Sequence, residues 1–528
     1  MNEISHPRGT GTLWGASELV LRGPADGNPF LEVTLAATFT HGTETRQVQG
    51  FHDGEGIYRV RFLPELEGIW HYRTSSNVPA LHGVSGELHV RAAREGDHGP
   101  VRVADTFHFR HADGTRYLNI GTTAYAWTHQ GDAREEETLA TLRDAPFTKI
   151  RMCVFPKHYR YNQNEPERYP FAVLKRGASQ WPGTIESSGW HFDYDRPDPA
   201  YFRHLETRIR QLGEIGVEAD LILLHPYDRW GFSQMTAEQD DRYLRYVVSR
   251  LAAFPNVWWS MANEYDFMEN KSLEDWNRMI DVTANADPHG HLLSIHNAFP
   301  HFDWTDPRLT HVSIQRPDTE LSILWREQYG KPVSVDECCY EGDISEQWGN
   351  ISGLELVDKF WLGIVNGGYV THGETYYNDE EVLFWAKGGQ LTGSSVARIA
   401  FLRKILEAGP DRGLDPVLET RNHRILKIGA DNTTGPEMSR PAPGEESWSK
   451  VRFPYPIACD PHRYYLTYFS YRQPREITVP TPPGETYAAT LLDVWNMVET
   501  PLAGTFTRGE VILVDPKPYQ AIVLQRLD

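Results

Sequence analysis

The first hundred residues alternate apolar and polar side chains over short segments, which is the pattern of half-buried β-strands. Residues 31–35 and 58–62 both show this alternation, because successive side chains of a strand point to opposite faces of its sheet. Pairs such as Asp53-Gly54 and His82-Gly83 are typical of the turns between such strands. Short strands at this spacing predict an Ig-like β-sandwich over residues 1–104.

From residue 105 to residue 411, short apolar runs alternate with longer amphipathic segments. The runs that predict strands are residues 117–121, 148–155, 218–224, 257–261, 292–296, 311–314, 332–335 and 368–371. Segments 201–212, 238–253 and 391–406 have the spacing of helices that bury one face. This rhythm predicts a (β/α)8 TIM barrel. A doubly wound open sheet is the alternative, but the sequence lacks the glycine-rich phosphate loop that usually follows an early strand of such a sheet.

The last part of the chain, residues 412–528, returns to strand patterns. Residues 464–469 and 511–514 are rich in aromatic and β-branched side chains, which favour strands. A connector that contains Pro480, Pro482, Pro483 and Gly484 is typical of turns. We therefore predict a C-terminal β-sandwich, and an α/β fold in which two β-sandwiches flank the barrel.

Composition and charge narrow the classes of function. The 528 residues include 16 Trp, 25 Tyr and 22 Phe, and aromatic faces stack on the apolar faces of sugar rings, although β-rich cores use them too. A formal net charge of −20 disfavours nucleic acids and anionic membranes as partners. The sequence also lacks an apolar run of about 18 residues, so we expect no membrane span.

Compartment and redox state are predicted from the N-terminus and the cysteines. The first residues show no basic segment followed by an apolar one, so we expect no secretory signal and a cytoplasmic location. The cysteines at positions 153, 338, 339 and 459 lack the CxxC spacing of zinc sites and argue against a disulfide scaffold.

Two glutamates follow predicted strands, where barrel enzymes carry their catalytic groups. The fourth strand runs into Asn263-Glu264 and the seventh into Glu337, 73 residues after Glu264. Strands four and seven face each other across a barrel mouth, so the two carboxylates could flank the anomeric carbon of a sugar. Burial beside aromatic side chains would raise the pKa of Glu264, which suits a general acid. A retaining glycosidase holds its carboxyl groups about 5–5.5 Å apart and an inverting one about 6.5–9.5 Å, and the sequence leaves this distance open.

Glu341 is a second candidate for the nucleophile, four residues after Glu337. We favour Glu337 because it ends the apolar run directly. The alternation of the strand predicts that Asp336 points between strand and helix and has a structural role.

The order of Asn-Glu after strand four and Glu after strand seven is similar to that of the clan A glycoside hydrolases. More narrowly, the chain resembles the apiosidase-like barrel family in residues 121–127, 337–342 and 388–394. Residues 50–54 and 67–70 resemble the β-sandwich that often precedes such barrels, and the C-terminal β domain is similar to one that often follows them. The resemblance covers nearly the whole chain.

The resemblance implies a retaining (β/α)8 enzyme in which Glu264 is the general acid/base and Glu337 the nucleophile. It also implies that the substrates are side-chain sugars of plant or microbial origin, including furanosides such as arabinofuranosides or apiosides.

Polar and aromatic residues follow the other strands as well and could hold a sugar. Each one alone could be a satisfied polar group of the core or of a loop, but together they favour a binding site. We expect the Asn263 amide to donate to a sugar hydroxyl, and Trp127, Trp230 and Trp385 to stack on sugar rings. The complete predicted substrate-binding set is Asn263, Trp127, Tyr159, His225, Trp230, His296, Gln315, His372 and Trp385.

Two other chemistries fit the sequence less well. A cation site after strand eight could use His372, Glu374, Asp379, Glu380 and Glu381, but the spacing is neither HExxH nor that of a facial triad. We therefore predict no metal and no cofactor. The absence of a GxSxG motif from the sequence disfavours a Ser/His/Asp hydrolase.

Together these observations predict an exo-acting retaining glycosidase for short oligosaccharides or glycosides. The exo mode rests on the missing signal and on the bulky loop of residues 159–190 at the predicted barrel mouth. An endo-acting glycanase of the same clan is the alternative within this class. A non-catalytic carbohydrate-binding protein on a barrel scaffold is the alternative outside it, although such a protein has no need for both carboxylates. The sequence does not decide between a monomer and a homo-oligomer.

Overall fold

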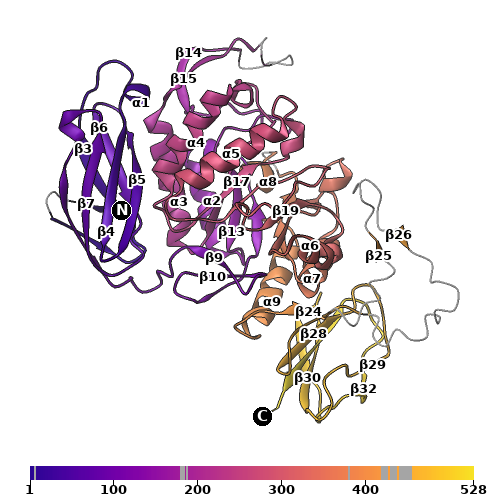
Figure 1. The fold of residues 1–528 in the computed structure, drawn as a ribbon. Coiled ribbons are helices and arrows are strands. Elements are labelled where there is room, and N and C mark those ends of the chain that lie inside the picture. Colours follow the sequence, from indigo (N-terminus) through magenta and orange to yellow (C-terminus); the bar gives the residue numbers. More distant parts are fainter. Residues whose placement is uncertain are drawn as a thin grey trace.

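A computed structural model describes residues 1–4, 8–178, 185, 188–378, 381–417, 426–427, 437–438 and 455–527. An N-terminal β-sandwich lies on one side of a central α/β barrel, and a C-terminal antiparallel β domain lies on the other (Figure 1). The predicted fold class is therefore confirmed.

The N-terminal unit is a sandwich whose two sheets share one strand. This strand, β5 (Glu44–His52), pairs with β4 (Leu35–His41) along its first part and with β6 (Ile57–Phe62) from Gly50 onward. The remaining strands are β1 (Asn2–Glu3), β2 (Arg8–Thr12), β3 (Ser17–Arg22), β7 (Gly68–Ser76) and β8 (Ser85–Arg91). The strand predicted at residues 31–35 is wrong except at Leu35, where β4 begins, because Pro29 starts a short helix, α1 (Pro29–Glu32).

The barrel consists of eight parallel strands in the hydrogen-bonded order β18-β17-β16-β13-β12-β22-β20-β19. A further parallel bridge between His296 and Ser313 joins the two ends of this order and closes the ring. The strands are β12 (Gly121–Thr123), β13 (Lys149–Cys153), β16 (Glu218–Leu224), β17 (Val257–Ala262), β18 (Leu293–Ser294), β19 (Val312–Gln315), β20 (Val333–Glu337) and β22 (Tyr369–His372).

Helices cover the outside of the barrel (Figure 1). They are α2 (Asp132–Asp144), α3 (Pro199–Glu214), α4 (Ala237–Leu251), α5 (Leu273–Ala286), α6 (Ser322–Tyr329), α7 (Gly353–Val365) and α9 (Ser395–Glu407). The four-residue α8 (Phe384–Lys387) lies in the loop after β22 and pairs with the loop after β12. Capping explains several boundaries: Asp198 accepts from the amide of Ala200 at the start of α3, and Thr236 and Gln239 form a capping box on α4. Between β18 and β19, where every residue is described, the chain forms no α-helix, so the barrel departs from eight full repeats there.

The first predicted barrel strand, residues 117–121, lies four residues too early. Tyr117 belongs to β11 (Arg116–Tyr117), which pairs in a small antiparallel sheet with β10 (His108–His111) and β9 (Val101–Ala104). Phe109 of this sheet packs 5.3 Å from the ring of Trp258 and 5.2 Å from that of Tyr369. Because both rings lie near the starts of their strands, the small sheet covers the amino-terminal end of the barrel.

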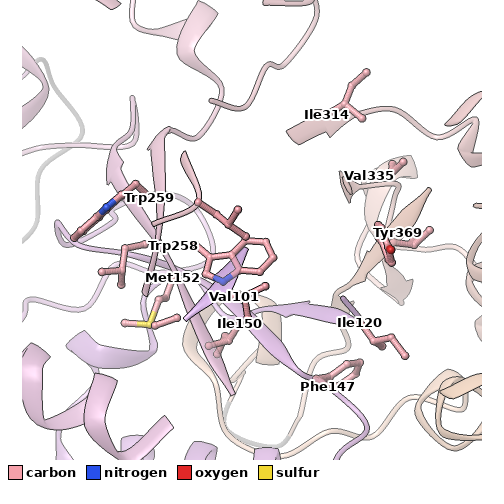
Figure 2. Packing of buried hydrophobic residues seen from close by; sticks show 14 of the residues in the cluster. Val101, Ile120, Phe147, Ile150, Met152, Trp258, Trp259, Ile314, Val335 and Tyr369 are labelled. Carbon is pink, nitrogen blue, oxygen red and sulfur yellow. The ribbon is translucent and has the colours of Figure 1, made fainter. Parts of the chain in front are cut away.

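The main apolar core lies between the barrel strands and the helices. Figure 2 shows Ile150 and Met152 of β13 and Trp259 of β17 in this cluster. Trp258 is also part of the cluster, but its ring lies 5.1 Å from Lys149 Nζ, on the inner side of the barrel. The alternate residues of β13, Lys149 and Arg151, are equally buried but meet residues of strands across the barrel, so they point into its interior.

Buried ion pairs hold the N-terminal sandwich against α3 and α4. Arg250 of α4 donates to Asp53 of the sandwich at 2.8 Å. Arg61 of the sandwich donates to Glu206 of α3 at 2.9 Å and to the carbonyl of Arg250 at 2.7 Å. These charged contacts fix the orientation of the sandwich on the barrel.

The C-terminal unit packs a six-stranded antiparallel sheet against α7. The Tyr468 ring lies 5.4 Å from that of Trp361, and its hydroxyl donates to Asp358 at 2.7 Å. The opposite face of the sheet forms a separate apolar cluster with a two-stranded sheet. The strands are β24 (Asp415–Pro416), β27 (Ile457–Asp460), β28 (Tyr464–Tyr468), β30 (Tyr487–Asp493), β31 (Val498–Pro501), β33 (Gln520–Arg526), and the pair β29 (Glu476–Thr478) and β32 (Val511–Leu513). Across the described residues, every helix is too short or too polar to cross a membrane.

Candidate active site

The carboxylates of Glu264 and Glu337 meet at the carboxyl-terminal end of the barrel. Glu264 follows β17 and Glu337 ends β20. Both are buried, with exposed surface fractions of 6% for Glu264 and 8% for Glu337. Glu264 has a φ of +52°, a conformation that costs a non-glycine residue free energy and is often found at functional sites. Backbone bonds on both sides hold it, since Asn263 N donates to Leu224 O and Tyr265 N donates to His296 O, each at 3.0 Å.

Gln315, at the end of β19, lies between the two carboxylates. Only the nitrogen of its amide can donate to both of them, which fixes the orientation of the side chain. In this orientation the nitrogen lies 3.2 Å from Glu264 Oε1 and 3.1 Å from Glu337 Oε2. These two oxygens therefore cannot be farther apart than the sum of the distances, about 6.3 Å. Gln315 thus brings one oxygen of each carboxylate to the same amide group.

Glu337 is held by donors from the first two barrel strands. The Tyr125 hydroxyl, just after β12, donates to Glu337 Oε1, and Arg151 Nη1 donates to the same oxygen at 3.3 Å. Arg151 Nη2 also donates to Asn263 Oδ1 at 3.2 Å, and the Tyr125 hydroxyl oxygen lies 3.2 Å from the same atom. His296 Nε2 lies 3.8 Å from Glu337 Oε1. Because Tyr125 and Arg151 contact both Glu337 and Asn263, they tie the ends of strands four and seven together.

Glu264 is held by neutral donors. The hydroxyl of Tyr227 and Asn263 Nδ2, the latter at 3.1 Å, both donate to Glu264 Oε2. Burial and the nearby charge of Glu337 raise the pKa of Glu264 to about 7, against the opposing effects of Lys157 and Tyr227. A carboxyl group with such a pKa is partly protonated at neutral pH and can donate a proton.

Asp336 points into the barrel rather than between strand and helix, so the prediction from alternation is wrong. The pairing of β19 with β20 shifts register here, since Ile314 pairs with Val335 but Gln315 pairs with Glu337. Asp336 is the extra residue of this bulge, which lets two successive side chains face inward. It accepts hydrogen bonds at 2.6–2.9 Å from Lys149, Ser313, Ser334 and Thr371. These contacts are consistent with the predicted structural role.

Aromatic side chains enclose the barrel mouth above the carboxylates. The rings of Tyr125 and Tyr159 lie 5.5 Å and 5.4 Å from that of Trp385. The loop after β13 meets the loop after β20, where the hydroxyl of Tyr161 donates to Glu346. The walls of the site thus come from several βα loops.

Of the predicted substrate-binding residues, the structure brings one group to the carboxylates. Asn263, His296 and Gln315 lie within contact distance of them, and Tyr159 and Trp385 belong to the aromatic walls. His225 lies beside the site with its ring 6.5 Å from Tyr227, and its Nε2 contacts the carbonyl of Phe155.

The other three predicted binding residues lie elsewhere. Trp127 is fully buried in the main core and donates to Met152 Sδ. Trp230 packs among loop aromatics and donates to Glu165. His372 points outward from β22, where it stacks on Phe147 and contacts Thr122. A position after a strand does not by itself predict that a side chain lies in the site, because alternation directs half of such side chains away from the barrel axis.

The carboxylate of Glu341 accepts hydrogen bonds at the start of α9. Its carboxylate accepts the backbone amides of Ser394 and Ser395 at 2.7 Å and 3.0 Å and the hydroxyl of Ser394 at 2.9 Å. A carboxylate at this end of a helix also complements the helix dipole. The geometry therefore gives Glu341 a capping role and leaves Glu337 to face Glu264.

Of the acidic residues after strand eight that were candidates for a cation site, the structure describes Glu374 and Glu381. Glu374 accepts backbone amides from Thr392 and Gly393, and Asp379 and Glu380 lie outside the described residues. Another cluster, Asp132, Glu135 and His204, has suitable ligand atoms within 4.8 Å of one another. However, Arg208 already donates to Asp132 and Glu135, so this cluster carries its own cation.

Sequence reasoning missed three side chains of the site: Tyr125, Arg151 and Lys157. Tyr125 lies in a segment that carried the family resemblance, and Tyr227, which follows the third strand, was among the polar residues at strand ends that could hold a sugar. Arg151 is hidden within an apolar run, where a charged residue is itself a signal because burial of an unpaired charge is costly.

Comparison with known proteins places the chain in a family. A family model described as the apiosidase-like catalytic domain matches residues 104–398, more than half of the sequence. The chain belongs to the apiosidase-like family. Two domains of unknown function flank the apiosidase-like barrel, DUF5060 over residues 10–77 and DUF5605 over residues 453–525. This confirms the resemblance, and the chain is a glycoside hydrolase of this family.

Solved structures support the same relationship. The apiosidase-like chain is 36% identical to a proposed glycoside hydrolase from Bacteroides vulgatus ATCC 8482, with a TM-score of 0.85, and the match covers 98% of this chain and 100% of that one. A family 5 glycoside hydrolase from the same organism shares the fold, with a TM-score of 0.57 at 14% identity over 81% of this chain and 93% of the other. A search of curated proteins found no match.

Proposed function

We propose that this protein is an exo-acting, retaining glycoside hydrolase. Glu337 attacks the anomeric carbon, and Glu264 donates its proton to the leaving oxygen. The glycosyl ester on Glu337 is then hydrolysed by a water molecule that Glu264 activates as a base. The observation that carries the proposal is the Gln315 amide within 3.2 Å of both carboxylates.

Two features support the division of roles. The raised pKa of Glu264 suits the residue that must donate and then accept a proton. Glu337 receives charge-assisted donation from Arg151, which stabilises a carboxylate and suits the residue that must be ionised to attack.

The burial of both carboxylates supports exo action. A site enclosed by Tyr125, Tyr159 and Trp385, with loops joined at Tyr161 and Glu346, favours a terminal sugar over the middle of a polymer. We propose short oligosaccharides or glycosides as substrates, furanosides such as arabinofuranosides or apiosides among them. The alternative, an endo-acting glycanase, would release internal fragments from a defined oligosaccharide.

A panel of nitrophenyl pyranosides and furanosides identifies a substrate, and the variant Glu337→Gln then tests the mechanism. We expect Glu337→Gln to lose turnover by several orders of magnitude while circular dichroism and melting temperature stay close to those of the wild type. Glu341→Gln is the matched control, because it removes a neighbouring carboxylate that caps α9, and it should retain turnover. Hydrolysis by Glu337→Gln at the wild-type rate would disprove the assignment. A 2-fluoro analogue of the substrate should also label Glu337, which mass spectrometry of the peptide detects.

A further inference from the structure

Lys157 presents a buried ammonium group at the barrel mouth. It follows β13 and is 2% exposed. Its Nζ lies 3.5 Å, 4.1 Å and 4.6 Å from the ring centroids of Tyr125, Tyr227 and Tyr159. Tyr125 donates to Glu337 and Tyr227 donates to Glu264, so this cation lies between the side chains that hold the two carboxylates.

This ammonium group lacks an acceptor. None of the residues that the structure describes gives it a hydrogen bond or an ion pair, and its polar contacts are with aromatic faces. Cation–π contacts recover part of the cost of burying a cation, but an ammonium group has three donors, which a ring face satisfies poorly. Elsewhere in the barrel the chain does pair such a group, since Lys149 donates to both Asp220 and Asp336.

A second donor beside Lys157 is also unsatisfied. The hydroxyl of Tyr159 is buried and has no hydrogen-bond partner in the described part of the chain. A phenol can accept as well as donate, but an ammonium group can only donate. The Lys157 ammonium group, 4.6 Å from the centroid of the Tyr159 ring, and the hydroxyl of that ring are both suited to a ligand group that only accepts, and a carboxylate or a sulfate is such a group.

We propose that Lys157 binds an anionic substituent of the substrate, so that this enzyme acts on glycosides of acidic sugars. The carboxylate of a uronic acid is the form that best fits a single buried ammonium group, and a sulfate ester has the same recognition chemistry. Tyr159 provides a second donor to this group. This proposal rests on the proposed glycosidase function. The kinetic test below requires hydrolysis, whereas the binding test does not.

Matched pairs of substrates provide the kinetic test. Nitrophenyl glucuronides and galacturonides are compared with the corresponding glucosides and galactosides, in both anomeric forms, and with their 6-sulfated derivatives. We expect the wild type to prefer the anionic member of a pair, and Lys157→Met to reduce this ratio of kcat/KM values by about 10- to 100-fold, the usual contribution of a charge-assisted hydrogen bond. Lys157→Arg should retain a preference for the anion. Lys404→Met removes an exposed lysine paired with Glu499 and should leave the ratio unchanged.

Binding separates this inference from the proposed function. Free glucuronate and galacturonate should raise the melting temperature of the wild type, but not that of Lys157→Met, and the neutral sugars should have a smaller effect. Anion binding that depends on Lys157, without hydrolysis of any glycoside, would support the inference and contradict the glycosidase function. Hydrolysis of neutral glycosides with no anion preference, or an equal loss for both members of a pair in Lys157→Met, would overturn the inference and leave the function intact. The absence of both binding and hydrolysis for every anionic compound would also overturn it.

Discussion

Two groups of buried acidic side chains lie in successive layers inside the barrel, and their partners differ in charge. In the deeper layer, Asp336 and Asp220 share the ammonium group of Lys149, and hydroxyl groups complete the shell of Asp336. In the upper layer, Glu264 accepts from the neutral donors Tyr227, Asn263 and Gln315. Arg151 reaches both layers, since it lies 3.7 Å from Asp220 and donates to Glu337.

This difference separates acids that stabilise the barrel from an acid that can exchange a proton. Burial alone would raise the pKa of Asp336, but Lys149 and Arg151 outweigh burial and hold that pKa well below its usual value. Asp336 is thus held in its ionised form at neutral pH. For Glu264, burial and the charge of Glu337 prevail, and its pKa is raised to about 7. Asp336 and Glu264 thus differ in the charge of their donors. Asp220 does not follow Asp336, because burial and the charge of Asp336 raise its pKa although Lys149 and Arg151 oppose this.

The largest expected effect is that of removing the proton donor in the upper layer. Glu264→Gln should lower kcat/KM by about 10²- to 10⁴-fold on a glycoside with a poor leaving group, the usual contribution of general acid catalysis. The loss should be smaller for a dinitrophenyl glycoside, which leaves without protonation. Steady-state kinetics on the two substrates measures the difference. An equal loss on both would show that Glu264 is needed for something other than proton donation.

The next effect, on stability, comes from breaking the deeper layer. Asp336→Asn leaves Lys149 and Arg151 with too little buried negative charge, so we expect a loss of about 3–5 kcal/mol in the free energy of unfolding. Urea denaturation followed by tryptophan fluorescence measures it. Glu407→Gln is the control. It breaks an ion pair between Glu407 and Arg403, whose side chains are 52% and 34% exposed. The loss in the free energy of unfolding should therefore be below about 1 kcal/mol. Similar values for the two variants would contradict the view that Asp336 balances a buried charge.

A smaller effect on stability distinguishes Glu341 from the catalytic pair. Glu341→Gln weakens the cap on α9, where the carboxylate accepts from Ser394 and Ser395, so we expect a loss of about 1–2 kcal/mol. Thermal denaturation measures this loss, and turnover at a temperature where both proteins are folded should be close to that of the wild type. A large loss of turnover without a loss of stability would favour Glu341 as the nucleophile.

The sequence alone predicted features that are local or periodic. The alternation of apolar runs with helices predicted the barrel, and strand ends indicated Glu264, Glu337 and Gln315 as candidates for the site. It could not predict the bulge at Asp336, because a register shift depends on pairing with a neighbouring strand. The direction of a side chain also depends on tertiary packing, so the sequence indicated Trp127 as a binding residue although its side chain faces the core. The sequence did not indicate Lys157, because Tyr125 and Tyr227, which surround it, come from loops distant in sequence.

The smallest expected effect is a change in pH dependence when one neutral donor of the upper layer is lost. The Tyr227 hydroxyl stabilises the ionised form of Glu264 and so lowers its pKa. In Tyr227→Phe the pKa of Glu264 should rise. Because kcat/KM falls as the general acid deprotonates, the basic limb of its pH profile, near pH 7 in the wild type, should move to higher pH. Tyr468→Phe removes a comparable hydroxyl-to-carboxylate bond, to Asp358 beneath the C-terminal sheet, and should leave the profile unchanged. A shift to lower pH in Tyr227→Phe would mean that Tyr227 stabilises the protonated acid, and the neutral donors would then not explain how Glu264 differs from Asp336.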